Sequence, residues 1–146
     1  MKGNASPAEV LAKAKTIAVV GASRSPEKEA NSVPRYLKER GYRIVPINPS
    51  ADEILGERAY PTLLELPREL GMAVDVVEVF RPGEELPRVA TEVVEMKKRY
   101  ERAPVFWAQL GLENDEARRI LEAGGIGYVM DACMRTVHQT YIRKTA

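Results

Sequence analysis

Five short apolar runs recur along the chain, and this recurrence restricts the possible fold more than any other feature. The runs lie at 16–21, 42–49, 74–80, 103–111 and 126–133. The first run is β-branched and shows no alternation of apolar and polar side chains, which is typical of a strand covered on both faces. We therefore expect five buried strands.

Helical patterns fill the intervals between most of these runs. Apolar residues in 84–100 follow the i, i+3, i+4, i+7 spacing of an amphipathic helix. The segment 114–125 predicts another helix, capped by Asn114 and ended by Gly124. Residues 51–67 predict a loop or small hairpin followed by a short helix.

Two segments near the N-terminus carry further helix signals. In 6–15, Ser6 is placed as an N-cap with Pro7 at the first helical position. In 31–42, Ser32 is the candidate N-cap, Pro34 falls in the first turn and Gly41 ends the helix. Helices and strands thus alternate along the chain.

Strands that alternate with helices form a parallel sheet with right-handed crossovers. The expected fold is α/β and Rossmann-like: a doubly wound, mainly parallel five-stranded sheet in the order 3-2-1-4-5, flanked by helices. Because 146 residues contain neither a repeat nor a linker, the sequence predicts a single domain over 1–146.

Composition and charge exclude several classes of protein. A formal net charge of +1 argues against a nucleic-acid-binding protein that relies on bulk electrostatics. The chain has no apolar run of membrane-spanning length, and its N-terminal segment lacks the apolar core of a secretory signal. Cys133 is the single cysteine, which excludes an internal disulfide and leads us to expect a cytoplasmic protein.

The loop after the first strand is the first candidate binding site, because ligands of such sheets lie beyond the carboxyl ends of the strands. It combines a glycine that permits close backbone approach with hydroxyls, positive charges and a helix N-terminus, which suits a diphosphate. The alternative is a plain turn in which the glycine relieves crowding and the charges are solvated. The candidate contacts here are Gly21, Ala22, Ser23, Arg24, Ser25, Lys28 and Ser32.

The end of the second strand separates two classes of nucleotide. NAD-binding domains place Asp or Glu there to hold a ribose hydroxyl, whereas this chain has Asn48, Pro49 and Ser50. An NAD dehydrogenase is therefore disfavoured. The absence of a Walker lysine excludes a P-loop NTPase. Asn and Pro are also ordinary turn residues, and a turn is compatible with a ligand contact.

Six motifs resemble a known family and run in the same order through most of the chain. They are "IAVVGAS", "SVPRYLKERGYRIVPINPS", "EILGERAYPTLLELP", "VDVVEVFR", "WAQLG" and "YVMDAC". The chain resembles the small stand-alone proteins of the CoA-binding-domain family (the YccU type), relatives of the N-terminal domain of the succinyl-CoA synthetase α-subunit. The resemblance implies that coenzyme A, or an acyl-CoA, lies across the strand ends, with its phosphates by the first loop.

The resemblance also implies which positions contact the cofactor. The synthetase domain has a lysine at about Ala51, which is missing here. Either Arg24 or Lys28 supplies the charge that attracts the 3′-phosphate, or binding is weaker than in the synthetase domain. The positions that match the family motifs are Gly21, Ala22, Ser23, Asn48, Pro49, Phe80, Arg81, Gln109 and Gly111.

Catalytic and metal-binding residues are not predicted. Cys133 and His138 are interpreted as a core thiol and an unrelated histidine, because their spacing separates them on a helix and Cys is usually buried. Because Cys133 lies near a strand end that the CoA thiol could pass, a mixed disulfide with CoA stays open as the one reactive alternative. One Cys and one His do not make a structural zinc site. Asp75 and Glu78 are interpreted as structural residues.

Three classes of function remain open from the sequence. The first is a CoA-binding module without chemistry of its own. The second is an enzyme, either an NAD(P)-linked oxidoreductase or a subunit acting with a separate CoA-ligase partner. The third is a regulatory protein with a vestigial pocket. A small-molecule ligand is expected, no contact with nucleic acid or membrane is expected, and a protein partner is left open.

Overall fold

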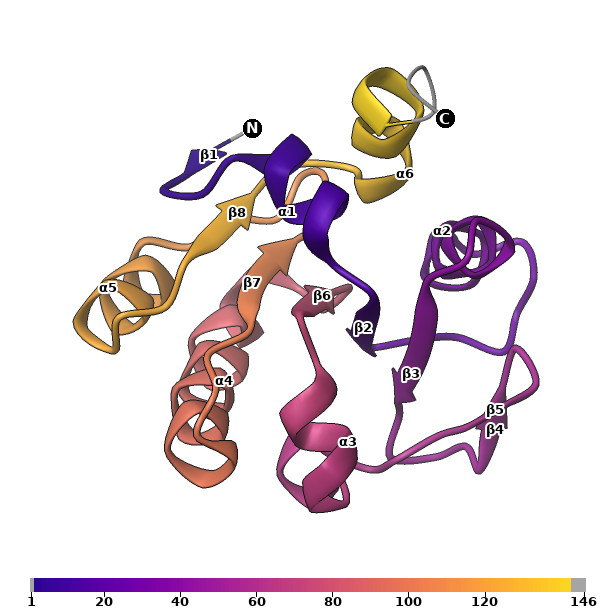
Figure 1. Cartoon of the computed structure of the whole chain (residues 1–146), viewed down its shortest axis with the longest axis horizontal. Coiled ribbons are helices and arrows are strands. Elements are labelled where there is room, and N and C mark those ends of the chain that lie inside the picture. Colours follow the sequence, from indigo (N-terminus) through magenta and orange to yellow (C-terminus); the bar gives the residue numbers. More distant parts are fainter. Residues whose placement is uncertain (1, 143–146) are drawn as a thin grey trace.

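A computed structural model describes residues 2–142. Its centre is a six-stranded sheet in the order β1-β8-β7-β6-β2-β3, covered by helices on both faces (Figure 1). Neighbouring strands pair in parallel except at the β1 edge, where β1 runs antiparallel to β8. The strands are β1 (Lys2–Gly3), β2 (Thr16–Val20), β3 (Arg43–Ile47), β6 (Val76–Val79), β7 (Val105–Ala108) and β8 (Tyr128–Met130).

The predicted strand order 3-2-1-4-5 is wrong, although the fold class is confirmed. Numbered as the sequence predicts them, the five parallel strands lie in the order 2-1-3-4-5, because β6 pairs with β2 on the side away from β3. The β3-to-β6 connection crosses beneath the sheet on the face that α4 and α5 cover (Figure 1). A right-handed crossover on that face must run in the opposite direction to the β2-to-β3 crossover.

The first part of the connection between β3 and β6 has the structure that the sequence predicts. It holds a small hairpin of β4 (Glu53–Ile54) and β5 (Glu57–Arg58), then the short helix η1 (Leu63–Glu65). A further helix, α3 (Arg68–Ala73), was not predicted. The sixth strand, β1, was not predicted either, because two residues are too short to show a strand period.

Three of the predicted helices are confirmed together with their end signals. Helix α1 (Pro7–Lys13) has Ser6 at its N-cap, where the hydroxyl accepts from the N–H of Glu9 at 3.4 Å. Helix α5 (Asp115–Ala123) is capped by the amide oxygen of Asn114. Helix α4 (Leu86–Tyr100) buries its predicted apolar stripe against the sheet, whereas Val94 is only partly buried. The remaining helices are η2 (Gly83–Glu85), α6 (Met134–Val137) and η3 (His138–Ile142).

Helix α2 (Glu29–Glu39) starts one turn earlier than predicted. Lys28 is its N-cap, so Ser32 is not the cap but lies inside the first turns. Pro34 is then an interior proline, buried against the sheet. Gly41 follows the helix at φ +98°, as its predicted role as the end of the helix requires.

Two apolar layers, one on each face of the sheet, make up the core. One joins α4, α5 and the β3-to-β6 connection to residues such as Val77 and Phe106. The other joins α1, α2 and α6 to residues such as Val19 and Trp107. The carboxyl ends of the parallel strands therefore meet at one edge of a rigid, doubly covered sheet.

Candidate functional site

A cleft of about 530 Å³ lies at the carboxyl ends of β2, β3 and β6. It stands at the switch point, where the connections leave β2 and β6 in opposite directions. Loops after β2 and β3 form part of its wall, and the segment from the end of β6 into α4 forms another part. The lining residues are Val20, Gly21, Ile47, Asn48, Pro49, Ser50, Pro61, Thr62, Arg81, Arg88 and Glu92.

Gly21 allows the loop after β2 to pack closely against the residues that follow β6, and both segments form walls of this cleft. Its φ of +84° lies in the left-handed region, and a Cβ there would meet the Phe80 carbonyl oxygen at 2.7 Å and Arg81 Cδ at 3.0 Å. A side chain would push the loop after β2 away from the end of β6. The glycine therefore relieves crowding, as one of the two sequence interpretations has it, and it does so within the cleft wall.

Asn48 links the first loop to the second. Its side-chain N–H donates to the Ala22 carbonyl at 2.9 Å, and its side-chain oxygen accepts from the N–H of Ser50 at 2.7 Å. Its backbone N–H donates to the Tyr60 carbonyl at 2.9 Å. Asn48 is thus both a turn residue and a lining residue of the cleft.

The loop after β2 is held in shape by its own polar groups. The Ser23 hydroxyl accepts from the N–H of Ser25 at 3.0 Å, and the Ser23 carbonyl accepts from Asn31 Nδ2 at 2.8 Å. Asn31 is buried and was not predicted as a site residue; the signal for it is a polar side chain on the apolar face of α2. Within residues 2–142, the N–H groups of Ala22 and Arg24 have no hydrogen-bond acceptor.

The arginines that line the cleft differ from those expected to supply charge. Arg24 and Lys28 are exposed and do not line it, whereas Arg81 and Arg88 do. Arg81 binds Glu85 through two N–H groups, at 3.2 and 2.8 Å. Arg88 bridges Glu85 at 3.2 Å and Glu92 at 2.7 Å. Hydrogen bonds from Arg81 and then Arg88 hold the pKa of the Glu85 carboxyl below its ordinary value.

Arg88 and Glu92 are site residues that the sequence reasoning missed. Their i, i+4 spacing on α4 is the ordinary pattern of a solvated ion pair. Their place in the cleft wall follows from how α4 leaves the end of β6, which the helix period does not reveal.

Other predicted contacts lie outside the cleft lining. Phe80 is half-buried, and Gln109 is buried beyond the end of β7, where its side-chain oxygen accepts from the N–H of Met134 at 3.3 Å. Gly111 is exposed at φ +84°, and its N–H donates to Asp131 at 2.7 Å. The residues that the structure places outside the lining are Ala22, Ser23, Arg24, Ser25, Lys28, Ser32, Phe80, Gln109 and Gly111.

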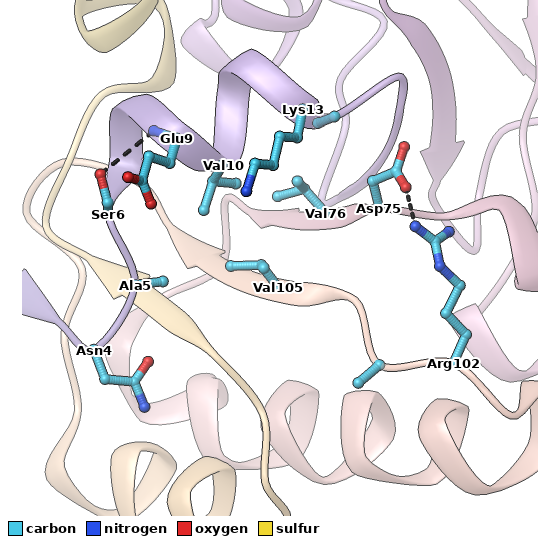
Figure 2. A pocket seen from close by; sticks show the side chains of 12 residues that line it. Asn4, Ala5, Ser6, Glu9, Val10, Lys13, Asp75, Val76, Arg102 and Val105 are labelled. Carbon is cyan, nitrogen blue, oxygen red and sulfur yellow. Dashed lines mark hydrogen bonds and ion pairs between the residues drawn. The ribbon is translucent and has the colours of Figure 1, made fainter.

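A second cavity, of about 450 Å³, opens at the amino ends of the strands (Figure 2). Val10, Val76 and Val105 form its apolar wall, and Lys13 points across it. The Asp75 carboxylate at its rim accepts from the backbone N–H groups of Lys15 at 2.7 Å and Thr16 at 2.9 Å, and pairs with Arg102. These contacts agree with the structural role expected of Asp75.

Cys133 and His138 are not brought together as a nucleophile and base. The His138 ring lies between those of Tyr36 and Tyr42, and its Nδ1 is 2.9 Å from the Tyr36 hydroxyl. Cys133 packs against the apolar layer that contains α1, α2 and α6 but is only partly buried, so the prediction of a core thiol is confirmed in part. The cysteine follows the strand by three residues and has left the buried sheet.

Among residues 2–142, no group of three or more His, Cys, Asp or Glu side chains is arranged to hold a metal ion. No helix in the same range has the length and apolar composition needed to cross a membrane.

A family model described as a CoA binding domain matches residues 15–139. The chain belongs to this CoA-binding family. The match includes all the loops that line the cleft at the switch point.

Relatives within and around the CoA-binding family differ greatly in length. The uncharacterized protein YneT of Bacillus subtilis (strain 168) is 42% identical over 130 residues, which cover 89% of this chain and 90% of YneT. The ADP-forming acetate–CoA ligase II of Archaeoglobus fulgidus is 39% identical over 80 residues, which cover 53% of this chain and 11% of the ligase. The chain thus corresponds to nearly all of YneT and to a small part of the ligase.

Solved structures show the same fold in a protein of similar length and as a part of a longer synthetase chain. A Thermus thermophilus protein superposes with a TM-score of 0.81 at 37% identity, covering 92% of this chain and 95% of that one. The dinucleotide-forming acetyl-coenzyme A synthetase 1 of Ca. Korarchaeum cryptofilum gives a TM-score of 0.67 at 25% identity, covering 84% of this chain and 27% of the synthetase chain. The chain is therefore a CoA-binding domain related to those of ADP-forming acetyl-CoA synthetases.

Proposed function

We propose that this chain binds coenzyme A, free or acylated, in the cleft at the switch point, and does so without catalysis of its own. The observation that carries the proposal is the composition of the cleft. Asn48 stands where an NAD-binding domain needs a carboxylate, and two arginines line the same cleft. A ligand with a 3′-phosphate on its ribose suits this wall, whereas an unphosphorylated ribose does not require it.

The diphosphate of CoA would lie at the loop after β2. The N–H groups of Ala22 and Arg24, which lack an acceptor within the described residues, are available as donors there. Helix α2 begins just beyond the loop at Glu29 and adds the positive end of its dipole. Gly21 keeps the loop against the end of β6 and so keeps these donors at the cleft.

The 3′-phosphate would lie at Arg81 and Arg88. Both guanidinium groups are held by carboxylates of α4 and its first turn, which orients them before any ligand binds. They supply the charge that the synthetase domain draws from a lysine at about Ala51. A bidentate arginine is also the better match to a phosphate, because its donors form a planar fork.

Calorimetric titration with CoA, 3′-dephospho-CoA and NAD tests the proposal. We expect CoA to bind most tightly, dephospho-CoA more weakly and NAD not comparably. Tight NAD binding with no heat from CoA would reject CoA as the ligand. Native mass spectrometry of the freshly purified protein gives an independent reading, since a co-purified ligand of CoA mass is expected.

A second candidate, a role beside a separate ligase subunit, is favoured by the likeness to ADP-forming acetate–CoA ligases. The test is an assay for acyl-CoA formation from CoA, acetate and ATP, run with the protein alone and with added cell extract. Activity only with the extract supports the partner role. Activity with neither favours a binding module.

A further inference from the structure

Three buried polar atoms without hydrogen-bond partners gather behind Cys133. They are both carboxyl oxygens of Glu78 and the side-chain nitrogen of Gln109, and among the described residues no other buried side-chain oxygen or nitrogen lacks a partner. Glu78 is fully buried and Gln109 is 2% exposed. Unsatisfied buried polar groups are rare because nothing replaces the hydrogen bonds to water that they lose on folding, so two in one place point to a function.

The strand register sets these groups on one face of the sheet. Glu78 pairs with Trp107 across β6 and β7, so both side chains lie on the same face. Gln109 follows Trp107 by two residues and continues that face. The Trp107 indole N–H donates to the Ala132 carbonyl at 2.9 Å, and Gln109 accepts from the N–H of Met134. The two bonds are made by Ala132 and Met134, the residues immediately before and after Cys133.

Cys133 also lies at the ligand edge of the sheet. It follows the end of β8 by three residues, and parallel strands bring their carboxyl ends to one edge. Helix α6, which begins at the next residue, packs on α2, and α2 begins beyond the loop after β2. The thiol is partly exposed there, whereas the two polar groups behind it are not.

The Glu78 carboxyl lies behind Cys133 and interacts with it electrostatically. Burial, and next the neighbouring Cys133, raise the pKa of the Glu78 carboxyl well above its ordinary value. Burial therefore favours the neutral form of Glu78, which puts no negative charge behind the sulfur. The Glu78 carboxyl and the Gln109 side-chain N–H form no hydrogen bond with Cys133 Sγ or with any other described residue, and so remain available to a group that reaches this site.

We propose that Cys133 is a thiol–disulfide exchange site for the thiol end of the bound cofactor, with Glu78 and Gln109 as its positioning residues. This inference rests on the proposed function. The Cys133 thiolate attacks one sulfur of CoA disulfide, a new S–S bond joins Cys133 to that CoA, and the original S–S bond breaks. The second CoA leaves as a thiolate and takes a proton from water. Cys133 is oxidised and the released CoA is reduced, so electrons balance.

Intact-protein mass spectrometry tests the exchange. Reduced protein is mixed with CoA disulfide or with glutathione disulfide, which has the same reactive bond but no nucleotide. We expect one CoA adduct that dithiothreitol reverses, formed about tenfold or more faster than the glutathione adduct because the nucleotide holds the reacting sulfur in place. Cys133→Ser should form no adduct and should still bind reduced CoA. Absence of an adduct, or equal rates for the two disulfides, overturns the inference.

Calorimetry keeps the two proposals apart. If the wild-type protein binds reduced CoA but forms no adduct, the exchange site fails and the CoA site stands. If reduced CoA does not bind, the CoA site fails and the exchange loses its basis with it.

Two variants test the positioning residues. Gln109→Leu should slow alkylation of Cys133 by iodoacetamide several-fold at pH 7, because the side-chain oxygen that accepts from the N–H of Met134, the residue after Cys133, is lost. Glu78→Gln keeps a neutral donor and should alkylate at close to the wild-type rate. Circular dichroism of each variant confirms that it is folded. A rate unchanged in Gln109→Leu, or one slowed equally in both, would assign these residues to the core alone.

Discussion

The backbone N–H of Ser23 donates to the carbonyl oxygen of Ala30 at 3.2 Å. In an uninterrupted helix that carbonyl would accept from the residue four positions later, but that residue is Pro34, which has no N–H. The proline therefore leaves an acceptor on α2 that the loop after β2 uses. An interior helix proline and the shape of the candidate phosphate loop are linked through one carbonyl.

Replacing Pro34 by alanine should loosen this loop. The new N–H would compete for the Ala30 carbonyl, and Ser23 would lose its acceptor. We expect CoA affinity to fall roughly 2- to 10-fold, the equivalent of one hydrogen bond, and hydrogen exchange at the Ser23 amide to quicken. Pro7→Ala is the matched control, because that proline opens α1 away from the cleft. Unchanged Ser23 exchange in Pro34→Ala would contradict the link.

Gly21→Ala should cost stability for two separable reasons. A positive φ strains any L side chain, and the new Cβ would overlap the Phe80 carbonyl. Together these effects should lower the free energy of unfolding by about 2–4 kcal/mol. Gly41→Ala isolates the first effect, because Gly41 has a φ of +98° and open space around its Cβ position, and should cost about 1 kcal/mol. Urea denaturation measures both, and equal losses would refute the steric argument.

The sequence predicts those parts of the fold that depend on local signals. The caps at Ser6 and Asn114 and the apolar stripe of α4 are read directly from residue type and spacing. The strand order cannot be predicted from such local signals, because it depends on which face of the sheet the β3-to-β6 connection crosses. No residue pattern within β3 or β6 records that choice.

The residues of the candidate site also divide into those that local sequence signals predict and those that depend on the strand order. Gly21 and Asn48 follow strands and were found by that rule, which holds for any order of parallel strands. Arg88 lies in the first turn of α4, and its place in the cleft depends on how β6 pairs beside β2. Gln109 follows a strand too, but its side chain turned into the sheet face, where it lies behind Cys133 rather than in the cleft.

Arg88→Ala should weaken CoA more than 3′-dephospho-CoA. Loss of a charge-assisted contact to the 3′-phosphate costs about 1–3 kcal/mol, which is roughly a 5- to 150-fold loss for CoA. Arg24→Ala, an exposed charge outside the lining, is the comparison and should have the smaller effect. Calorimetry with both ligands decides. An equal loss for CoA and dephospho-CoA would remove Arg88 from recognition of the 3′-phosphate.

Glu78→Gln should stabilise the protein at neutral and alkaline pH. In the folded state the pKa of Glu78 is raised by burial, so the unfolded chain loses this proton at lower pH than the folded chain does. Stability therefore falls as the pH rises above about 4.5 and on through the raised pKa. The variant has no such proton, and at pH 8 we expect a gain of about 1 kcal/mol or more. A variant with the same pH dependence as the wild type would show that Glu78 does not titrate as argued.

Asp75→Asn should show the opposite dependence. Burial raises the pKa of the Asp75 carboxyl, but hydrogen bonds from Arg102 and from the N–H groups of Thr16 and Lys15 outweigh it, and the net pKa is lowered. The carboxylate thus contributes stability that is present above about pH 4 and is lost as the pH falls through the lowered pKa. At pH 7 the variant should lose about 2 kcal/mol, because the charge on its hydrogen bonds is gone. At a pH below the lowered pKa the two proteins should converge. Thermal unfolding from pH 2 to 8 measures the difference, and a loss that persists undiminished at the acid end would mean that packing, rather than charge, is what Asp75 contributes.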